Sequence, residues 1–534
     1  MKHFLLFLFL ILLSGGLSAQ DQTLKIVPQP SFVTLAAGEL TLTSAVNVYV
    51  DKRSGLDANF IGQTLKGMGF QPKLVSKEAQ GKISFILEGK ESEQKDESYR
   101  LIIGENDQVI IKSASRKGLL YGLQTLRQIA KTRQDEVVLQ RCTISDQPAF
   151  SWRAFMLDES RNFQGKEVVK DLLDEMSRLK LNVFHWHLVD DPAWRIEIKR
   201  YPKLTTLASK GNFGQMQKFT TTNDTRWDSL FVAPPAQYYT QKDIKEIVAY
   251  AQKRGISIIP EIEVPGHVSA SVYAYPWLGA TSKTLGKGVH GDLYDVTDPK
   301  VEEFVHNVLD EIISLFPGGI IHIGGDEANY QHWKDSETVN KFMKEKNIPT
   351  YADLQVWAIN RMSKYISSKG YRMIGWNEIT GDNVRGEAHM EEGKSEKLAD
   401  GTVVQFWDGQ VTLVNKAIEK GFDVVNSDRH HTYLDYPYEV TPLEKAYSFN
   451  PIPTGLAEKD KKKILGLGTQ MWSEYTPTTE RLYFQIFPRI AAYSEVGWVQ
   501  PEKKSSYQDF RGRLRNIEAA WDAKGYLKQQ KGKY

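Results

Sequence analysis

Two adjacent carboxylates follow a short apolar run beyond the middle of the chain. Residues 320–323 read Ile-Ile-His-Ile, and the run ends in Gly324-Gly325-Asp326-Glu327. Such a pattern is typical of a buried parallel strand that surfaces at its carboxyl end. Glycine there lets a ligand approach the backbone closely, and carboxylates at such ends lie where α/β folds place their chemistry. The alternative is an acidic solvated turn, against which stand the two glycines and three similar strand ends.

Those three strand ends carry His, Trp and further carboxylates. They are residues 182–191 (Asn-Val-Phe-His-Trp-His-Leu-Val-Asp-Asp), 256–267 (Ile-Ser-Ile-Ile-Pro-Glu-Ile-Glu-Val-Pro-Gly-His) and 374–378 (Ile-Gly-Trp-Asn-Glu). In a barrel, all carboxyl ends face one rim, so these side chains would converge there. The residues expected on the rim are Asp158, Arg161, Asp190, Asp191, Glu263, His267, Asp326, Glu327, Trp376, Glu378, Trp407, Asp408, Asp428, Tyr433, Asp435, Trp472 and Glu474. Carboxylates mixed with Trp and Tyr suit a sugar, because aromatic faces pack on a pyranose and charged groups bind its hydroxyls.

Other kinds of site fit the rim less well. A phosphate site would need more Arg and Lys. A zinc site would need three clustered ligands, and His185 and His187 share one strand face without an evident third. We therefore expect no metal and no cofactor.

The four motifs together resemble the family 20 glycoside hydrolases, the β-N-acetylhexosaminidases. The resemblance extends from about Ile26 to about Trp498, and the order and spacing of the motifs agree. It implies an exo-acting enzyme that removes terminal N-acetylglucosamine or N-acetylgalactosamine with retention of configuration. Asp326 and Glu327 have α-carbons about 3.8 Å apart, so they are poorly placed to flank a glycosidic bond. The family solution is substrate assistance, in which the 2-acetamido oxygen attacks the anomeric carbon and forms an oxazolinium intermediate.

The resemblance also implies a role for each matching residue. Glu327 would be the general acid and base, and Asp326 would accept the acetamido N–H. His267 and Asp190 would form a relay toward Glu327, with Asp190 preferred to its neighbour Asp191. The predicted substrate-binding residues are Arg161 for O3 and O4, Trp376, Trp407 and Trp472 around the acetamido methyl, Tyr433 for the acetamido oxygen, and Asp435 and Glu474 for O6 and O4.

Alternating strand and helix patterns position these residues. The predicted strands are 152–157, 183–188, 257–262, 320–323, 372–376, 403–407, 423–426 and 464–470, and helical patterns include 166–179, 242–253, 301–315 and 354–367. Eight such units predict an α/β fold with a (β/α)₈ barrel over residues 151–500, with a doubly wound open sheet as the alternative. Long segments at 192–239 and 268–297 follow the second and third strands, where they would form part of the site.

A smaller domain precedes the predicted barrel. Residues 21–150 contain strand-like runs at 46–50, 83–87, 99–103 and 109–112 and a helical pattern at 118–130, which predicts an α+β domain with one helix on an antiparallel sheet. The resemblance implies that this domain is not catalytic. Residues 501–534 carry one helical pattern, 510–521, expected to pack on the barrel's outside.

Residues 1–20 have the composition of an export signal. Lys2 is followed by an apolar run from Phe4 to Leu13, and Ala19 offers a cleavage site. The run is too short to span a bilayer, so we expect a periplasmic or extracellular protein without a membrane span. The formal net charge of +2 predicts no nucleic acid partner, and the single cysteine, Cys142, excludes an internal disulfide. The sequence gives no oligomeric state.

Two other functions remain open from the sequence. One is a barrel that binds sugar without catalysis, although Glu327 is intact. The other is a two-carboxylate retaining glycosidase, for which Glu263 or Glu378 could be the second carboxylate. The natural glycan and the preference between gluco and galacto epimers are not readable from the sequence.

Overall fold

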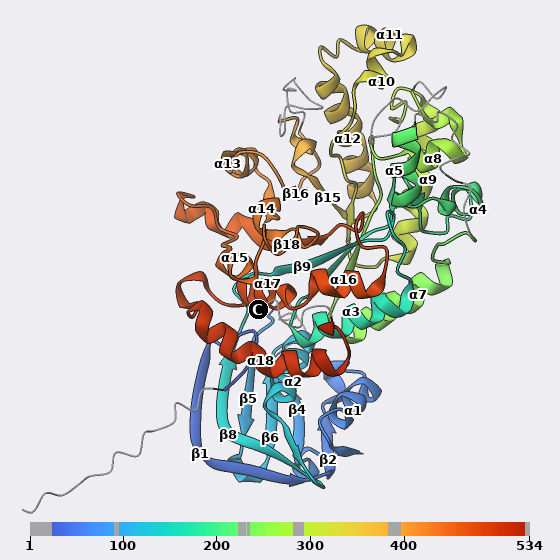
Figure 1. The fold of residues 1–534 in the computed structure, drawn as a ribbon. Coiled ribbons are helices and arrows are strands. Elements are labelled where there is room, and N and C mark those ends of the chain that lie inside the picture. The colour runs from blue at the N-terminus through green and yellow to red at the C-terminus, as the bar shows by residue number, and fades with distance from the viewer. Residues whose placement is uncertain are drawn as a thin grey trace, which may run out of the picture.

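The computed structural model describes residues 24–89, 96–222, 231, 235–280, 293–382 and 397–528. The predicted export signal lies outside the described residues. Figure 1 shows a sheet domain built from the first part of the chain at one end of the molecule and a larger barrel domain above it. None of the helices within the described ranges is long and apolar enough to cross a membrane.

The larger domain is a closed barrel of eight parallel strands, so the predicted barrel is confirmed and the open sheet is wrong. The strands are β9 (Trp152–Asp158), β10 (Val183–His187), β13 (Ser257–Glu261), β14 (Ile320–His322), β15 (Arg372–Trp376), β16 (Val403–Phe406), β17 (Asp423–Asn426) and β18 (Ile464–Met471). Their neighbours in the barrel follow chain order, and β18 closes on β9. Short runs rich in Val and Ile form these strands because both faces are buried.

Helices surround the barrel and bury the outward-facing strand residues. They include α3 (Lys166–Arg178), α7 (Gln241–Lys253), α9 (Pro299–Leu315), α12 (Tyr351–Ser368), α13 (Thr412–Glu419), α15 (Leu443–Ser448), α16 (Thr479–Ile486) and α17 (Arg489–Trp498). In α3, Val169, Leu172, Leu173 and Met176 form one fully buried face. The strand β10 shows the division clearly, because Phe184 and Trp186 join this outer core while Val183 joins a separate inner cluster.

The inner cluster closes the amino-terminal end of the barrel. It contains Trp152, Ala154, Val183, Ile259, Ile374, Val403 and Val425. Because side chains alternate along a strand, the next inward positions toward the carboxyl ends are two residues further on. In β10, β13 and β15 these are His185, Glu261 and Trp376. An apolar plug therefore lies beneath a polar layer, which supports the site.

The smaller domain is a mixed sheet with the order β1-β8-β5-β6-β4-β2-β3 and with β7 added on β8. Its elements are β1 (Phe32–Thr43), β2 (Ala45–Val50), α1 (Ala58–Lys66), β3 (Gln71–Val75), β4 (Ile83–Leu87), β5 (Tyr99–Ile103), β6 (Val109–Ser113), α2 (Arg116–Ile129), β7 (Lys131–Arg133) and β8 (Glu136–Asp146). The predicted antiparallel sheet is wrong in part: β2 pairs in parallel with β3 and β4, and β4 with β6. For β2 and β3, the helix α1 makes the crossover that a parallel pair requires.

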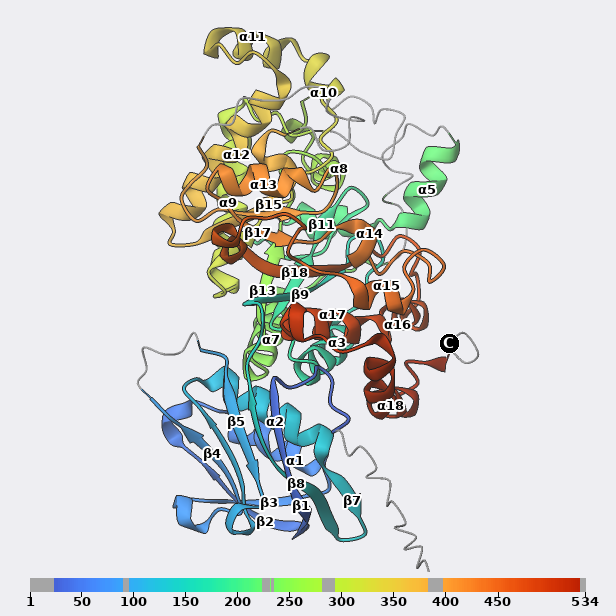
Figure 2. The same cartoon turned by 90° about the vertical axis from the view of Figure 1, so that its left-hand side faces the viewer.

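The last helix, α18 (Tyr507–Ala523), touches both domains. Trp521 donates its indole N–H to Glu175 of α3 at 2.8 Å. On the other side, Arg513 donates to the carbonyl of Ile26 at 2.8 Å, and Asn516 donates to that of Gln128 in α2 at 3.2 Å. Figures 1 and 2 show this helix beside the junction of the sheet domain and the barrel.

Candidate active site

The backbone turns sharply where β14 ends. Gly324 and Gly325 have φ of +65° and +92°, and Glu327 itself has a φ of +44°. A side chain on Gly324 would meet the carboxylate of Glu263, with an added Cβ 1.7 Å from Oε2. His267, at the end of the segment after β13, also has a positive φ, +55°. Left-handed backbone at residues other than glycine is strained, and such strain gathers at functional sites.

A cavity of about 390 Å³ opens at the carboxyl ends of the barrel strands. Its lining contains ten of the predicted site residues: Arg161, His267, Asp326, Glu327, Trp376, Trp407, Tyr433, Asp435, Trp472 and Glu474. Asp190 is not in the lining and lies behind it, 2% exposed. Four further residues line the cavity that the sequence did not single out: Phe213, Arg429, Tyr436 and Tyr475. Phe213 belongs to α5 (Phe213–Thr222), within the long segment after the second strand.

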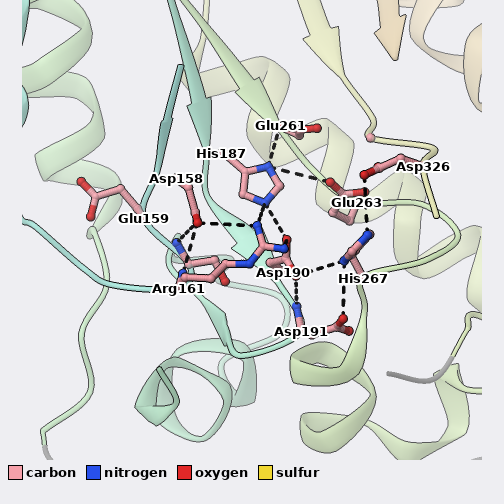
Figure 3. A network of polar contacts seen from close by, with 12 residues as sticks. Asp158, Glu159, Arg161, His187, Asp190, Asp191, Glu261, Glu263, His267 and Asp326 are labelled. Carbon is pink, nitrogen blue, oxygen red and sulfur yellow. Dashed lines mark hydrogen bonds and ion pairs between the residues drawn. The ribbon is translucent and has the colours of Figure 1, made fainter. Parts of the chain in front are cut away.

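His267 stands between two pairs of carboxylates, as Figure 3 shows for Asp190, Asp191 and Asp326. Its Nδ1 lies 3.2 Å from Asp190 Oδ1 and 3.4 Å from Asp191 Oδ2. Its Nε2 lies 3.6 Å from Asp326 Oδ2 and equally far from Glu327 Oε2. Burial lowers the pKa of His267, but Asp190 and Asp326 raise it more, to well above its usual range. The ring is therefore a cation that faces the two adjacent carboxylates.

Besides His267, three cationic or N–H groups hold Asp190. Arg161 Nη2 lies 2.7 Å and His187 Nε2 2.8 Å from its Oδ2, and the amide of Asp191 donates to Oδ1 at 2.6 Å. Burial raises the pKa of Asp190, but Arg161 and His267 lower it well below its usual range. Asp191 instead accepts hydrogen bonds from the amide and hydroxyl of Ser269, at 3.1 and 2.6 Å.

Aromatic side chains form one side of the cavity. The ring centroids of Trp376 and Trp407 are 6.5 Å apart, those of Trp376 and Trp472 are 6.0 Å apart, and those of Trp407 and Tyr433 are 6.3 Å apart. Arg161 lies over the Trp472 ring at 5.0 Å. Trp407 donates its indole N–H to Glu378 at 3.0 Å. These four rings line the same cavity as Asp326.

Comparisons with known proteins connect this geometry to a family. A family model described as "Glycosyl hydrolase family 20, catalytic domain" matches residues 150–501, and one described as "Glycosyl hydrolase family 20, domain 2" matches residues 23–147. The chain belongs to glycoside hydrolase family 20. The predicted resemblance is thereby confirmed, and this family 20 protein is a glycoside hydrolase.

Relatives and solved structures agree with the assignment. A β-hexosaminidase of Porphyromonas gingivalis is 34% identical over 81% of this chain, which spans only 54% of that relative's length. A β-hexosaminidase of Vibrio furnissii is 30% identical over 89% of this chain and 76% of its own. A β-N-acetylhexosaminidase structure from Bacteroides fragilis has a TM-score of 0.78 at 27% identity and covers 94% of this chain and 96% of its own. The exo-β-N-acetylglucosaminidase of Vibrio harveyi, solved with N-acetylglucosamine, has a TM-score of 0.80 at 27% identity, covering 94% of this chain and 78% of its own.

The two candidate carboxylates for a direct nucleophile lie below the cavity of this family 20 hydrolase. Glu263 is 2% exposed and Glu378 3%, and neither belongs to the described cavity lining. Burial, followed by the charge of Asp326, raises the pKa of both carboxyls well above the usual range. A protonated carboxyl is a poor nucleophile. The two-carboxylate mechanism therefore loses its candidate residues, and the adjacent pair Asp326–Glu327 is left facing the cavity.

A buried His–Glu cluster below the cavity was missed by the sequence analysis. Glu261 Oε2 is hydrogen-bonded to His185 Nε2 at 2.8 Å and to His187 Nδ1 at 2.6 Å. The other oxygen, Oε1, lies 2.9 Å from His322 Nδ1. No third ligand beside His185 and His187 was evident from the sequence, whereas the fold brings Glu261 and His322 to them. The sequence pattern that could have revealed the cluster is the presence of His and Glu at inward positions of β10, β13 and β14. It shows which of these residues meet only when the register of the strands is known.

Proposed function

We propose that the cavity is the active site of an exo-acting β-N-acetylhexosaminidase that hydrolyses terminal N-acetylglucosamine or N-acetylgalactosamine with retention, by substrate-assisted catalysis. The observation that carries the proposal is Asp326, which is 8% exposed with an Oδ1 that receives no hydrogen bond from the described residues. A buried carboxylate oxygen without a donor is costly, and the N–H of a 2-acetamido group would satisfy it.

The geometry supports the following sequence of steps. Asp326 accepts the acetamido N–H and turns the acetamido oxygen toward the anomeric carbon. That oxygen forms a bond to the anomeric carbon while the bond to the leaving oxygen breaks and Glu327 protonates the leaving oxygen. Glu327 then removes a proton from the water that opens the oxazolinium ring. Two inversions give net retention.

The surroundings of Asp326 match its proposed role. Burial raises its pKa to about 7, with His267 lowering it and Glu327 raising it. In its ionised form, the carboxylate stabilises the positive charge that develops on the acetamido group. Asp435 and Glu474 also line the cavity, and in this proposal they accept hydrogen bonds from ring hydroxyls. Burial raises the pKa of both carboxyl groups, and the charge of Arg161 partly opposes this rise at Glu474.

The proposal also includes export of the mature enzyme, supported by the composition of residues 1–20. N-terminal sequencing of the protein recovered outside the cytoplasm would give a start close to Gln20. Recovery of intact Met1 in the cytoplasm alone would contradict export.

Two variants on two substrates test the catalytic assignment. Glu327→Gln removes the proton donor, so activity on a disaccharide falls by about 10²–10⁴-fold, whereas a dinitrophenyl glycoside, whose leaving group needs no proton, loses much less. Asp326→Asn disturbs ring closure itself, so both substrates slow by similar factors. The measurement is kcat/KM for each pair. The opposite pattern, with leaving-group dependence at Asp326, would exchange the two roles.

A further inference from the structure

His187 lies between two carboxylates that belong to different parts of the site, as Figure 3 shows. Its Nδ1 is 2.6 Å from Glu261 Oε2, and its Nε2 is 2.8 Å from Asp190 Oδ2. Both nitrogens must carry a proton to donate to both carboxylates, so the ring is an imidazolium. The contacts agree with its charge: burial lowers the pKa of His187, but Glu261 and Asp190 raise it to about 10.

Glu261 joins this ring to the acetamido side of the cavity. The indole N–H of Trp376 donates to Glu261 Oε1 at 2.7 Å, while Oε2 receives both His185 and His187. Glu261 is fully buried at the inward end of β13, between β10 and β14, and its pKa is held well below the usual range by the three histidines against the effect of burial. A single ionised carboxylate therefore fixes the orientation of Trp376 and of His187 together.

The other end of His187 leads to the proton donor. Asp190 is hydrogen-bonded to His187 through Oδ2 and to His267 through Oδ1. The other nitrogen of His267, Nε2, lies 3.6 Å from Glu327 Oε2. The rings of His187 and Trp472 also pack in a T-shaped arrangement, with centroids 4.9 Å apart. The groups that face His187 are Glu261 and Glu263 from the β13 segment, Asp190 from β11 (Val189–Asp190) and Arg161 from the segment after β9.

We propose that Glu261 and His187 are positioning residues that couple the acetamido-binding wall to proton delivery by Glu327. The inference rests on the proposed function and deepens it. A substrate acyl group that packs well against Trp376 and Trp472 preserves the hydrogen bonds that join Glu261, His187 and Asp190. These hydrogen bonds orient His267 toward Glu327. A poorly seated acyl group disturbs the same contacts. Acyl recognition and proton transfer therefore depend on each other through one chain of buried hydrogen bonds that ends in the ion pair between His267 and Glu327.

Glu261→Gln tests the coupling from its centre. The amide keeps the size of the side chain but removes the charge that holds His187 as an imidazolium, and a neutral ring can donate to only one of its two neighbours. Misplacement away from the chemistry can cost about 10²-fold in rate. We expect two ratios to change by about tenfold each, a part of the 10²–10⁴-fold that a general acid contributes. The ratio of dinitrophenyl glycoside to disaccharide activity rises, and the preference for N-acetyl over N-propanoyl substrates falls.

Trp376→Phe tests the coupling from one end and serves if Glu261→Gln does not fold. This change removes the indole N–H that Glu261 accepts and leaves an aromatic wall. A wall residue without coupling would alter the acyl preference alone. The proposal predicts that Trp376→Phe also raises the dinitrophenyl-to-disaccharide ratio, although Trp376 is not in the proposed proton path.

Glu175→Gln is the matched control. Glu175 is also a buried carboxylate that accepts an indole N–H, from Trp521 at 2.8 Å, but it lies on α3 outside the barrel. Its replacement should lower the melting temperature and leave both activity ratios unchanged. If the folded Glu261→Gln or Trp376→Phe variant shows the wild-type dinitrophenyl-to-disaccharide ratio, the coupling is overturned. The proposed function fails separately, if the wild-type enzyme hydrolyses a β-glucoside as readily as the β-N-acetylglucosaminide.

Discussion

At the scale of single residues, burial raises the pKa of one carboxyl group in the site, and neighbouring cations lower it. Asp326 has a pKa near 7, and His267 facing it is held protonated by Asp190. Opposite shifts in neighbouring groups are how a fold assigns acid and base roles at neutral pH. The arrangement costs stability in the free enzyme, because one buried oxygen of Asp326 receives no hydrogen bond from the part of the chain that the structure describes.

The shift at Asp326 predicts a pH-dependent stability difference for Asp326→Asn. The folded-state pKa is raised from 3.8 to about 7, so the folded state binds more protons than the unfolded chain between these values. Wild-type stability therefore falls as pH rises from about 4 to 7, by at most ~4 kcal/mol at 1.36 kcal/mol per pKa unit. Asparagine has no such penalty. Calorimetry should show equal melting temperatures at pH 4 and a more stable variant at pH 8; a difference independent of pH would contradict the shift.

Trp376 and Trp472, which line the cavity, differ in how much their replacement should affect stability as well as activity. Trp472 is only partly buried, whereas Trp376 is 1% exposed and bonded to Glu261. Trp472→Ala should lower kcat/KM for the N-acetyl substrate by an equivalent of about 2–4 kcal/mol, with a small change in melting temperature. Trp376→Ala should lower both, because it also leaves a buried carboxylate short of a donor. Equal stability loss in the two variants would assign Trp472 to the core instead.

Site residues at the carboxyl ends of the strands were easier to predict from the sequence than buried site residues within the strands. Asp326 and Glu327 follow an apolar run, so their exposure to a cavity was readable. Glu261 and His322 are on separate strands, and nothing in their local sequence distinguishes them from other inward positions. Their contact depends on the barrel's register, in which Glu261 pairs with His322. Arg429, Tyr436 and Tyr475 in the cavity lining depend in the same way on the path of the loops.

At the scale of elements, the barrel strands were predictable because they are short runs rich in Val and Ile with both faces buried. The run Val403–Phe406 is buried at every residue and needs no partner to be recognised. The strand β1 is different: its first eight residues are all exposed, Gly38 lies within them, and its pairing with β8 shifts register between Leu35 and Glu39. Half-exposed strands of this kind are specified by neighbours rather than by their own sequence.

The end of β14 offers a matched pair of glycine substitutions. Gly319 and Gly324 flank the strand with φ of +74° and +65°, but a Cβ on Gly319 meets nothing within 4 Å whereas one on Gly324 meets Glu263. Gly319→Ala should cost about 1–2 kcal/mol of stability, because alanine is strained in the left-handed backbone conformation, and should keep activity. Gly324→Ala should lose most activity, because relieving the clash moves the turn that carries Asp326. Measured kcat/KM and melting temperature separate the two, and similar losses in both variants would mean that backbone strain, not Glu263, limits the position.

At the scale of the whole molecule, buried charges join the two domains. Lys180, which follows α3 and is fully buried, lies 3.0 Å from Asp146 Oδ2 at the end of β8 and 2.9 Å from the Tyr99 hydroxyl of β5. The indole of Trp498 at the end of α17 donates to the other oxygen of Asp146 at 3.0 Å. Beside them, Arg153 of β9 pairs with Glu97 at 2.8 Å. The sheet domain therefore supplies counter-charges that the base of the barrel requires.

Asp146→Asn tests whether this junction makes the two domains one cooperative unit. The amide preserves the size of the side chain but leaves the Lys180 ammonium in a dry interface without its carboxylate. Breaking a buried pair in this way typically costs about 3–5 kcal/mol, because the remaining charge is uncompensated. Asp107→Asn is the control within the same domain: its partner Arg141 lies 2.7 Å away, but the Asp107 side chain is 66% exposed, so the loss should be about 0–1 kcal/mol. Urea unfolding should show one transition in the wild-type enzyme, with activity and far-ultraviolet circular dichroism lost together. In Asp146→Asn we expect the midpoint to fall and the two signals to separate, since the sheet domain can then unfold while the barrel remains. If Asp146→Asn shifts the midpoint no more than Asp107→Asn, the domains are held by apolar packing alone, and the buried charges contribute nothing to their cooperation.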